Sequence, residues 1–205
     1  MTNFKPHPSP HDFGVLSMED IPFWLGTLQR VAMDFGEVVM LELGVANGGT
    51  TIGTKRHCDQ MGWQFEWVGL DMACGRPAFD LGRWGIFLEG DLHTAQAYNR
   101  VADTPHAYSF NLLMIDDCHC FEDCRDSFLR YSPLVRKGGY IAFHDTNAAP
   151  GWQGYHEQCK PDRFIGVRNA LKSLGLMDGS NIDYEFIGEQ DRGTTQGFRL
   201  YRKLI

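Results

Sequence analysis

Two short strings contain acidic residues and histidines that could do chemistry together. Asp116 and His119 lie in IDDCHCFED, which begins at residue 115, and His144 and Asp145 lie in FHDTN, which begins at residue 143. Carboxylate oxygens are preferred ligands of Mg²⁺, so the two aspartates are candidate metal ligands, with His144 as a less typical nitrogen ligand. A bound metal can acidify a hydroxyl group, and His119 is spaced to accept the proton that leaves. The strings therefore predict metal-assisted activation of a hydroxyl.

Two other interpretations of these strings stay open. Acids at strand ends often cap helices, with hydrogen-bonded histidines beside them. Alternatively, a zinc or iron site could form from the crowded sulfur and imidazole groups, Cys118, His119, Cys120 and Cys124. Zinc ligand pairs usually have at least two residues between them, whereas one residue separates Cys118 from Cys120. We therefore expect Cys120 and Cys124 to be small buried residues on one helix face.

A glycine-rich segment follows the short apolar run at residues 38–41. It reads LELGVANGGT from residue 41, and its glycines allow the backbone to turn sharply and approach a ligand. It contains neither G-K-[ST] nor G-x-G-x-x-G, and Glu42 beside it would repel a pyrophosphate but suit a cationic group. Asp71, 27 residues after Gly44, could accept two ribose hydroxyls, and Asp91 could contact an adenine edge. The alternative is an ordinary strand-to-helix turn.

Alternating short apolar runs and helical patterns must position these residues. Strands are expected at residues 38–41, 67–70, 86–88, 110–115 and 140–143, and helices at 50–61, 93–101, 121–134 and 164–174. The last two strands, 183–187 and 197–201, leave no room for a helix between them and should pair antiparallel. This alternation predicts an open α/β sheet, in which ligands bind at the carboxyl ends of the strands. An earlier helix should begin with a capping box of Ser17 and Asp20 and end at Gly36.

Length and composition narrow the class of protein. The chain has 205 residues, of which 43% are hydrophobic and 22% are charged, as is typical of one globular domain. No apolar run is long enough for a membrane helix, and no secretory signal stands at the start, so a cytoplasmic protein with free thiols is expected. The net charge of −7 disfavours nucleic acid as a partner.

The glycine-rich segment and the acids after it resemble class I S-adenosylmethionine-dependent methyltransferases. In that family the loop wraps the cationic methionine part of the cofactor, one acid holds the ribose and another lies near the adenine. The resemblance implies a cofactor site made by seven residues: Glu42, Gly44, Asn47, Gly48, Asp71, Asp91 and Asp116. It also implies an α/β Rossmann-like methyltransferase fold, with a mostly parallel seven-stranded sheet and an antiparallel C-terminal edge hairpin.

The two acidic strings are similar to those of a narrower group. Metal-dependent sugar O-methyltransferases and cephalosporin hydroxylase-like proteins carry I-D-G-D-H-S-Y-E, followed by G-G-x-x-x-x-H-D. Here Asp117 replaces the glycine and Cys118 the second aspartate. The resemblance implies a catalytic base, His119, and three ligands of Mg²⁺ or another divalent cation, Asp116, His144 and Asp145.

Together these features predict an enzyme that transfers a methyl group from S-adenosylmethionine to a hydroxyl of a small molecule, such as a sugar, polyketide or catechol. The alternatives are an S-adenosylmethionine-binding protein of hydroxylase-like chemistry and a zinc-binding interaction protein. Residues 1–36 should form an N-terminal arm and cap helix, and residues 37–205 the methyltransferase domain. In the insertion at 147–162, Trp152, Tyr155 and His156 could cover the acceptor. The short chain favours a small acceptor, or a partner subunit that completes the site in a homo-oligomer.

Overall fold

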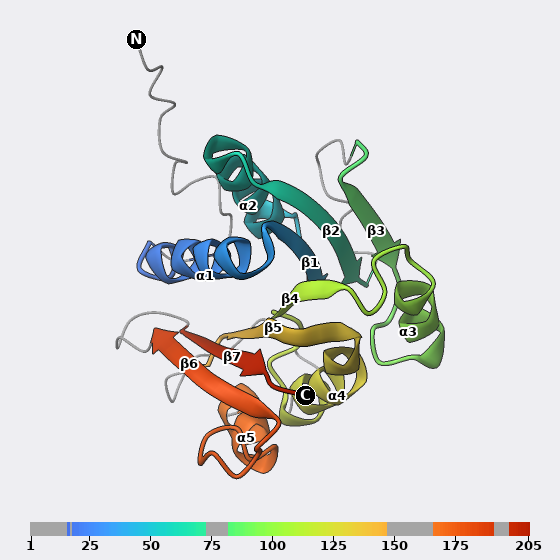
Figure 1. The fold of residues 1–205 in the computed structure, drawn as a ribbon. Helices are drawn as coiled ribbons and strands as arrows, with labels where there is room; N and C mark the ends of the chain where they lie inside the picture. The colour runs from blue at the N-terminus through green and yellow to red at the C-terminus, as the bar shows by residue number, and fades with distance from the viewer. Residues whose placement is uncertain (1–15, 17, 73–81, 147–165, 191–196) are drawn as a thin grey trace.

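The computed structural model describes residue 16 and residues 18–72, 82–146, 166–190 and 197–205. Within them a seven-stranded sheet has the order β3-β2-β1-β4-β5-β7-β6 (Figure 1). The strands are β1 (Glu37–Leu43), β2 (Gln64–Asp71), β3 (Gly85–Glu89), β4 (Phe110–Ile115), β5 (Val135–His144), β6 (Tyr184–Gln190) and β7 (Phe198–Lys203). Strands β1 to β5 pair in parallel, whereas β7 is antiparallel to β5 and to β6. The predicted mostly parallel sheet with an antiparallel C-terminal hairpin is confirmed.

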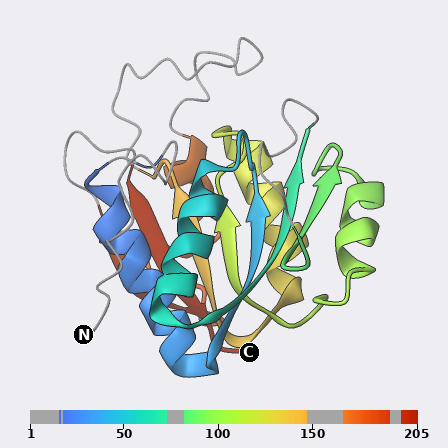
Figure 2. The same ribbon diagram turned by 90° about the horizontal axis from the view of Figure 1, so that it is seen from above.

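Figure 2 shows helices on both faces of this sheet. They are α1 (Asp20–Phe35), α2 (Gly49–Met61), α3 (Ala95–Ala102), α4 (Phe121–Tyr131) and α5 (Gly166–Ser173). Successive strand residues point to opposite faces, so Val38 and Met40 join one apolar cluster with α1 and α2, while Val39 and Leu41 join another with α3, α4 and α5. Coverage of both faces explains why all six residues of β4, FNLLMI, are buried. Five of them are apolar, and the side chain of the sixth, Asn111, accepts a hydrogen bond from the N–H of Val39.

Most element boundaries differ from the prediction by one to three residues, and the largest difference is at the start of β5. Strand β5 begins at Val135 rather than at residue 140, because the expected turn at 137–139 is absorbed into the strand as an irregularity. Gly138 permits this with a left-handed φ of +80°. Helix α4 ends at Tyr131, and a 3₁₀ turn, Ser132–Leu134, carries the chain into β5.

The predicted capping box at the start of α1 is wrong. The helix begins at Asp20 with Glu19 as its N-cap, and Ser17 lies outside the described residues. Asp20 is fully buried instead of lying at a solvated helix end. Helix α1 packs on the sheet through Trp24 and Leu28.

Several expectations are not tested by the described residues. The division of the chain after residue 36 stays a prediction, and the insertion at 147–162 lies outside the described residues together with its Trp152, Tyr155 and His156. Among the helices of the described ranges, none combines the length and apolar character needed to cross a membrane.

Candidate active site

The glycine-rich segment forms the turn from β1 into α2 at the carboxyl edge of the sheet. Gly44 has a φ of +82°, and its N–H donates to the carbonyl of Leu70 (3.0 Å). The N–H of Asp116 donates to the carbonyl of Leu43 (2.9 Å). A Cβ atom on Gly44 would overlap the backbone oxygen of Asp116. The turn and the end of β4 are therefore in direct backbone contact.

Asp71, at the end of β2, fixes the shape of this turn. Its Oδ2 accepts hydrogen bonds from the N–H groups of Val45 and Ala46, each 2.7 Å long. Ala46 has a φ of +47°, an uncommon conformation for a residue with a side chain, and these bonds help to hold it. The ribose contact of Asp71 stays a prediction, and its contact with the turn is an additional role.

The last residues of the turn lead into α2. Gly48 is the N-cap of α2 with a φ of +78°, and its N–H donates to the carbonyl of Val45 (2.8 Å). The exposed Asn47 accepts a hydrogen bond from the N–H of Gly49 through its Oδ1 (3.2 Å). The first turn of α2 thus begins beside Asp71, where the resemblance places the cofactor.

Glu42 lies inside the molecule rather than in the turn. Its carboxylate accepts hydrogen bonds from Thr51 Oγ1 and from Trp67 Nε1 (2.8 Å), and so joins β1 to α2 and β2. Burial raises the pKa of Glu42 to about 8, although the two hydrogen bonds lower it. Its contact with a cationic ligand stays a prediction, whereas the contacts that the structure shows are internal.

Glu42→Gln should change how stability depends on pH. The folded-state pKa of about 8 exceeds the ordinary value of 4.5, so the folded protein binds more protons than the unfolded chain between these values. The stabilisation by protonated Glu42 is complete below pH 4.5 and is lost as the pH rises through 8. Urea unfolding at pH 5 and pH 8 should therefore show wild type losing about 1 kcal/mol or more relative to Glu42→Gln. A control, Glu185→Gln, changes an exposed carboxylate and should run parallel to wild type. Parallel behaviour of Glu42→Gln would contradict the prediction.

Asp116, His144 and Asp145 meet where β4 and β5 end. His144 Nδ1 lies 2.9 Å from Asp116 Oδ1 and 3.2 Å from Asp145 Oδ2. One ligand atom from each residue lies within 4.8 Å of the others, and His144 and Asp145 are buried. Asp145 has a φ of +55°, a strained conformation of the kind found at functional sites. The structure thus brings together the three predicted metal ligands, which we call the carboxylate–histidine group.

His119 lies at the solvent-facing side of this group. Its Nε2 is 2.5 Å from Asp145 Oδ2 and 3.8 Å from Asp116 Oδ1, and its side chain is 36% exposed. Burial lowers the pKa of His119, but the two carboxylates outweigh burial and raise the pKa to about 10. Burial also lowers the pKa of His144, which the same carboxylates raise well above its ordinary value. The two carboxylates therefore favour the protonated form of both imidazoles, and the carboxylate–histidine group is a place that favours positive charge.

Comparison with known proteins finds no matching family model and no matching curated protein. Solved structures do match. A candidate caffeoyl-CoA O-methyltransferase from Staphylococcus aureus has a TM-score of 0.62 and 13% identity, covering 88% of this chain and 83% of its own. The MycE methyltransferase of mycinamycin biosynthesis, in complex with Mg, SAH and mycinamycin VI, has a TM-score of 0.61 and 23% identity, covering 98% of this chain. An O-methyltransferase from Bacillus cereus in complex with SAH has a TM-score of 0.61 and 15% identity, covering 92% of this chain and 84% of its own.

This chain has the O-methyltransferase fold. The predicted Rossmann-like methyltransferase fold and the resemblance to class I methyltransferases are confirmed at the level of the fold. The chain spans 55% of the MycE methyltransferase, so it corresponds to about half of that protein. The sequence identities of 13–23% are too low to assign the roles of a neighbour's residues to positions in this chain. The roles of individual residues are therefore argued from the geometry of this chain.

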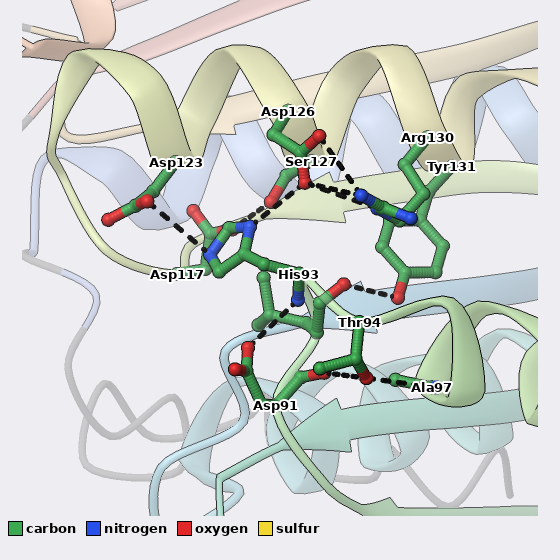
Figure 3. A network of polar contacts seen from close by, with 11 residues as sticks. Asp91, His93, Thr94, Ala97, Asp117, Asp123, Asp126, Ser127, Arg130 and Tyr131 are labelled. Atoms are coloured by element: carbon green, nitrogen blue, oxygen red, sulfur yellow. Dashed lines mark hydrogen bonds and ion pairs between the residues drawn. The ribbon is translucent and has the colours of Figure 1, made fainter.

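Asp91 lies after β3 in a network that the sequence did not reveal (Figure 3). Its Oδ1 accepts a hydrogen bond from the N–H of His93 (2.9 Å), and its carbonyl accepts one from Thr94 Oγ1 (2.7 Å). His93 Nδ1 lies 3.1 Å from Asp126 Oδ2 on α4. The contact of Asp91 with an adenine edge stays a prediction. The contacts that the structure shows hold the turn that leads from β3 into α3.

Asp117 occupies the position at which the resembling group carries glycine, and the structure gives it a separate partner. Its Oδ2 accepts a hydrogen bond from Ser127 Oγ on α4 (Figure 3). Burial raises the pKa of Asp117 to about 7, while Ser127 and the nearby His93 lower it. The side chain therefore points to α4, away from the carboxylate–histidine group, which explains how the substitution leaves that group intact.

The residues of the alternative zinc site do not gather around one point. His119 contacts Asp145, and Cys124 lies in the apolar core. Among the described residues, the grouping with metal-ligand spacing there is Cys118, Cys120 and Asp123. Cys58, Cys118 and Cys124 are free thiols as predicted, whereas Cys120 is disulfide-bonded, so that part of the prediction is wrong. Burial raises the pKa of the Cys118 thiol to about 12, which disfavours the thiolate that zinc requires.

Proposed function

We propose that this protein is a divalent-metal-dependent O-methyltransferase, which transfers the methyl group of S-adenosylmethionine to a hydroxyl of a small molecule. The observation that carries the proposal is the contact between two sites. The Gly44 turn packs on the backbone of Asp116, and the side chain of Asp116 belongs to the carboxylate–histidine group. A cofactor in the turn and a cation in the group would therefore be neighbours.

The carboxylate–histidine group fits a divalent cation in its donor atoms and its charge. Two carboxylates and one imidazole nitrogen converge, and carboxylate oxygens suit Mg²⁺. We propose Asp116, His144 and Asp145 as the ligands. When bound there, the cation would supply positive charge that lowers the pKa of an acceptor hydroxyl.

The chain's own residues would bind and orient the reactants. The turn after β1 would hold the methionine part of the cofactor, Asp71 its ribose and Asp91 its adenine. His119 lies at the exposed side of the group, 2.5 Å from Asp145, and from its neutral form it would accept the proton of the acceptor hydroxyl at Nε2. The carboxylates that raise its pKa to about 10 would face a bound cation instead, which would favour the neutral imidazole that this role requires. Alignment of the hydroxyl oxygen, methyl carbon and sulfur in one site would supply much of the rate enhancement.

The proposed acceptor is a sugar, polyketide or catechol hydroxyl. Support comes from the fold of the neighbours, which are described as O-methyltransferases, and from MycE, whose complex contains a mycinamycin together with Mg and SAH. A homo-oligomeric state and a cytoplasmic location stay predictions.

Calorimetry and a labelled-methyl assay test the proposed function. We expect the protein to bind S-adenosylhomocysteine and to methylate at least one member of a panel of sugar, polyketide and catechol hydroxyls in the presence of Mg²⁺ or Mn²⁺. Excess chelator should abolish transfer, and added metal should restore it. A protein that binds no S-adenosylhomocysteine would refute the whole proposal, whereas full turnover in chelator would refute the metal requirement alone.

A further inference from the structure

Asp20, the first residue of α1, is buried against the far side of the His144 ring. Its Oδ2 lies 3.9 Å from His144 Nε2, and both side chains are essentially inaccessible to solvent. His144 Nε2 has no hydrogen-bond partner among the described residues. At 3.9 Å the two groups interact as charges rather than through a hydrogen bond. Asp20 is nonetheless the carboxylate that faces this nitrogen.

The two nitrogens of His144 face different partners. Nδ1 points to Asp116 and Asp145, and Nε2 points to Asp20. An imidazole that binds a metal through one nitrogen carries its proton on the other, and that N–H almost always faces a carboxylate, a carbonyl or water. A ligand atom at Nδ1 therefore requires an Nε2–H, and a buried N–H without an acceptor costs about 1–3 kcal/mol.

We propose that Asp20 is a positioning residue that keeps the proton of His144 on Nε2 and leaves Nδ1 available as the metal ligand. The inference rests on the proposed function, because it concerns the metal site assigned there. It extends that site to the N-terminal helix, which would then be part of the metal site rather than only a cover over the sheet.

Aromatic packing holds Asp20 and His144 in a fixed relation. The ring of Phe198 on β7 lies 4.6 Å from the His144 ring and 5.8 Å from that of Trp24, one helical turn after Asp20. Trp24 Nε1 also donates to Thr54 Oγ1 on α2 (2.9 Å). The start of α1 therefore packs firmly on β7 and α2. Such packing is expected around a residue that must keep a metal ligand in position.

A simpler role for Asp20 is favourable interaction with the helix dipole in the first turn of α1. That role requires neither burial nor proximity to His144, and its loss would lower stability without changing metal affinity. Metal affinity therefore separates the two roles. Its measurement needs no methyl acceptor and no turnover.

Titration with Mn²⁺, followed by electron paramagnetic resonance, tests the inference on the full-length protein. Asp20→Ala should weaken Mn²⁺ binding by about 10–100-fold, the usual effect of losing such an outer partner. Asp20→Asn should bind more tightly than Asp20→Ala, because its amide oxygen keeps a partial negative charge beside Nε2. The control is Asp34→Ala, which removes a carboxylate from the other end of α1 that bonds to Tyr140 (2.6 Å), and it should bind Mn²⁺ like wild type.

Nitrogen NMR of the histidine side chains provides a second measurement. With Mg²⁺ bound, wild type should show His144 protonated on Nε2, and Asp20→Ala should need about 10–100-fold more Mg²⁺ to reach that state. Equal Mn²⁺ affinity in wild type and folded Asp20→Ala, or a proton on Nδ1 in the Mg²⁺-bound wild type, would overturn the inference. Tight Mn²⁺ binding by wild type without any methyl transfer would refute the proposed function and leave the inference standing. Absence of Mn²⁺ binding by wild type would refute the inference and the metal requirement together.

Discussion

Asp145→Asn is expected to lower kcat/KM for methyl transfer by at least ~10³-fold while leaving the fold intact. Asp145 contributes a buried charge that contacts both His119 and His144, and the loss corresponds to about 4 kcal/mol of transition-state stabilisation. Asparagine, like aspartate, tolerates the left-handed φ of +55° at this position, so the backbone should keep its path. Steady-state kinetics in saturating Mg²⁺ would measure the effect.

Two further measurements make this result specific to the charge of Asp145. Affinity for S-adenosylhomocysteine, measured by calorimetry, should stay at the wild-type value, because the turn after β1 and Asp71 are unchanged. Asp178→Asn removes an exposed carboxylate that bonds to Ser180 beyond α5, and it should leave kcat/KM unaltered. Near-wild-type turnover of Asp145→Asn would mean that the carboxylate–histidine group does not serve the reaction.

Gly44→Ala is expected to weaken S-adenosylhomocysteine binding by at least ~100-fold and to lower the free energy of unfolding by roughly 2–5 kcal/mol. The new methyl group would overlap the backbone oxygen of Asp116, so the turn and the end of β4 must separate. That movement disturbs both the proposed cofactor site and a proposed metal ligand. Calorimetry and urea unfolding would measure the two effects.

A matched variant separates the steric effect from the conformational one. Gly62, the C-cap of α2, has a similar φ of +75°, but a Cβ atom added there would meet nothing within 4 Å. Gly62→Ala should therefore cost only about 1–2 kcal/mol and should bind S-adenosylhomocysteine like wild type. If Gly44→Ala binds the ligand as tightly as Gly62→Ala does, the turn is not part of the cofactor site.

The centre of the sheet was predictable from the sequence because its central strands are buried on both faces. Continuous apolar runs such as residues 110–115 mark such strands whatever surrounds them, and β4 has the predicted bounds. The start of β5 was not predictable in the same way. A Lys-Gly-Gly sequence is typical of a turn, and only the pairing of Val135 with Phe110 and of Tyr140 with Leu112 shows that the strand extends across the glycines.

The candidate site was predictable where its residues follow strands directly. Asp116, His144 and Asp145 converge because parallel strands deliver their ends to one edge. Glu42 shows the limit: its position beside the glycines predicts a ligand contact, which stays a prediction, but gives no sign of the internal hydrogen bond with Thr51 on α2. Asp20 lies 124 residues before His144, and no local pattern reports a contact that depends on the packing of a helix on the finished sheet.

The stacking of Trp24 on Phe198 has a consequence for synthesis on the ribosome. Helix α1 emerges well before β7, which begins at Phe198, so the contact that fixes α1 beside His144 cannot form until β7 has left the exit tunnel. Pairings between residues so distant in sequence close late and slow folding. Metal uptake at the proposed site would therefore have to follow synthesis of β7, and a nascent protein that ends before β7 should remain unable to load a cation there.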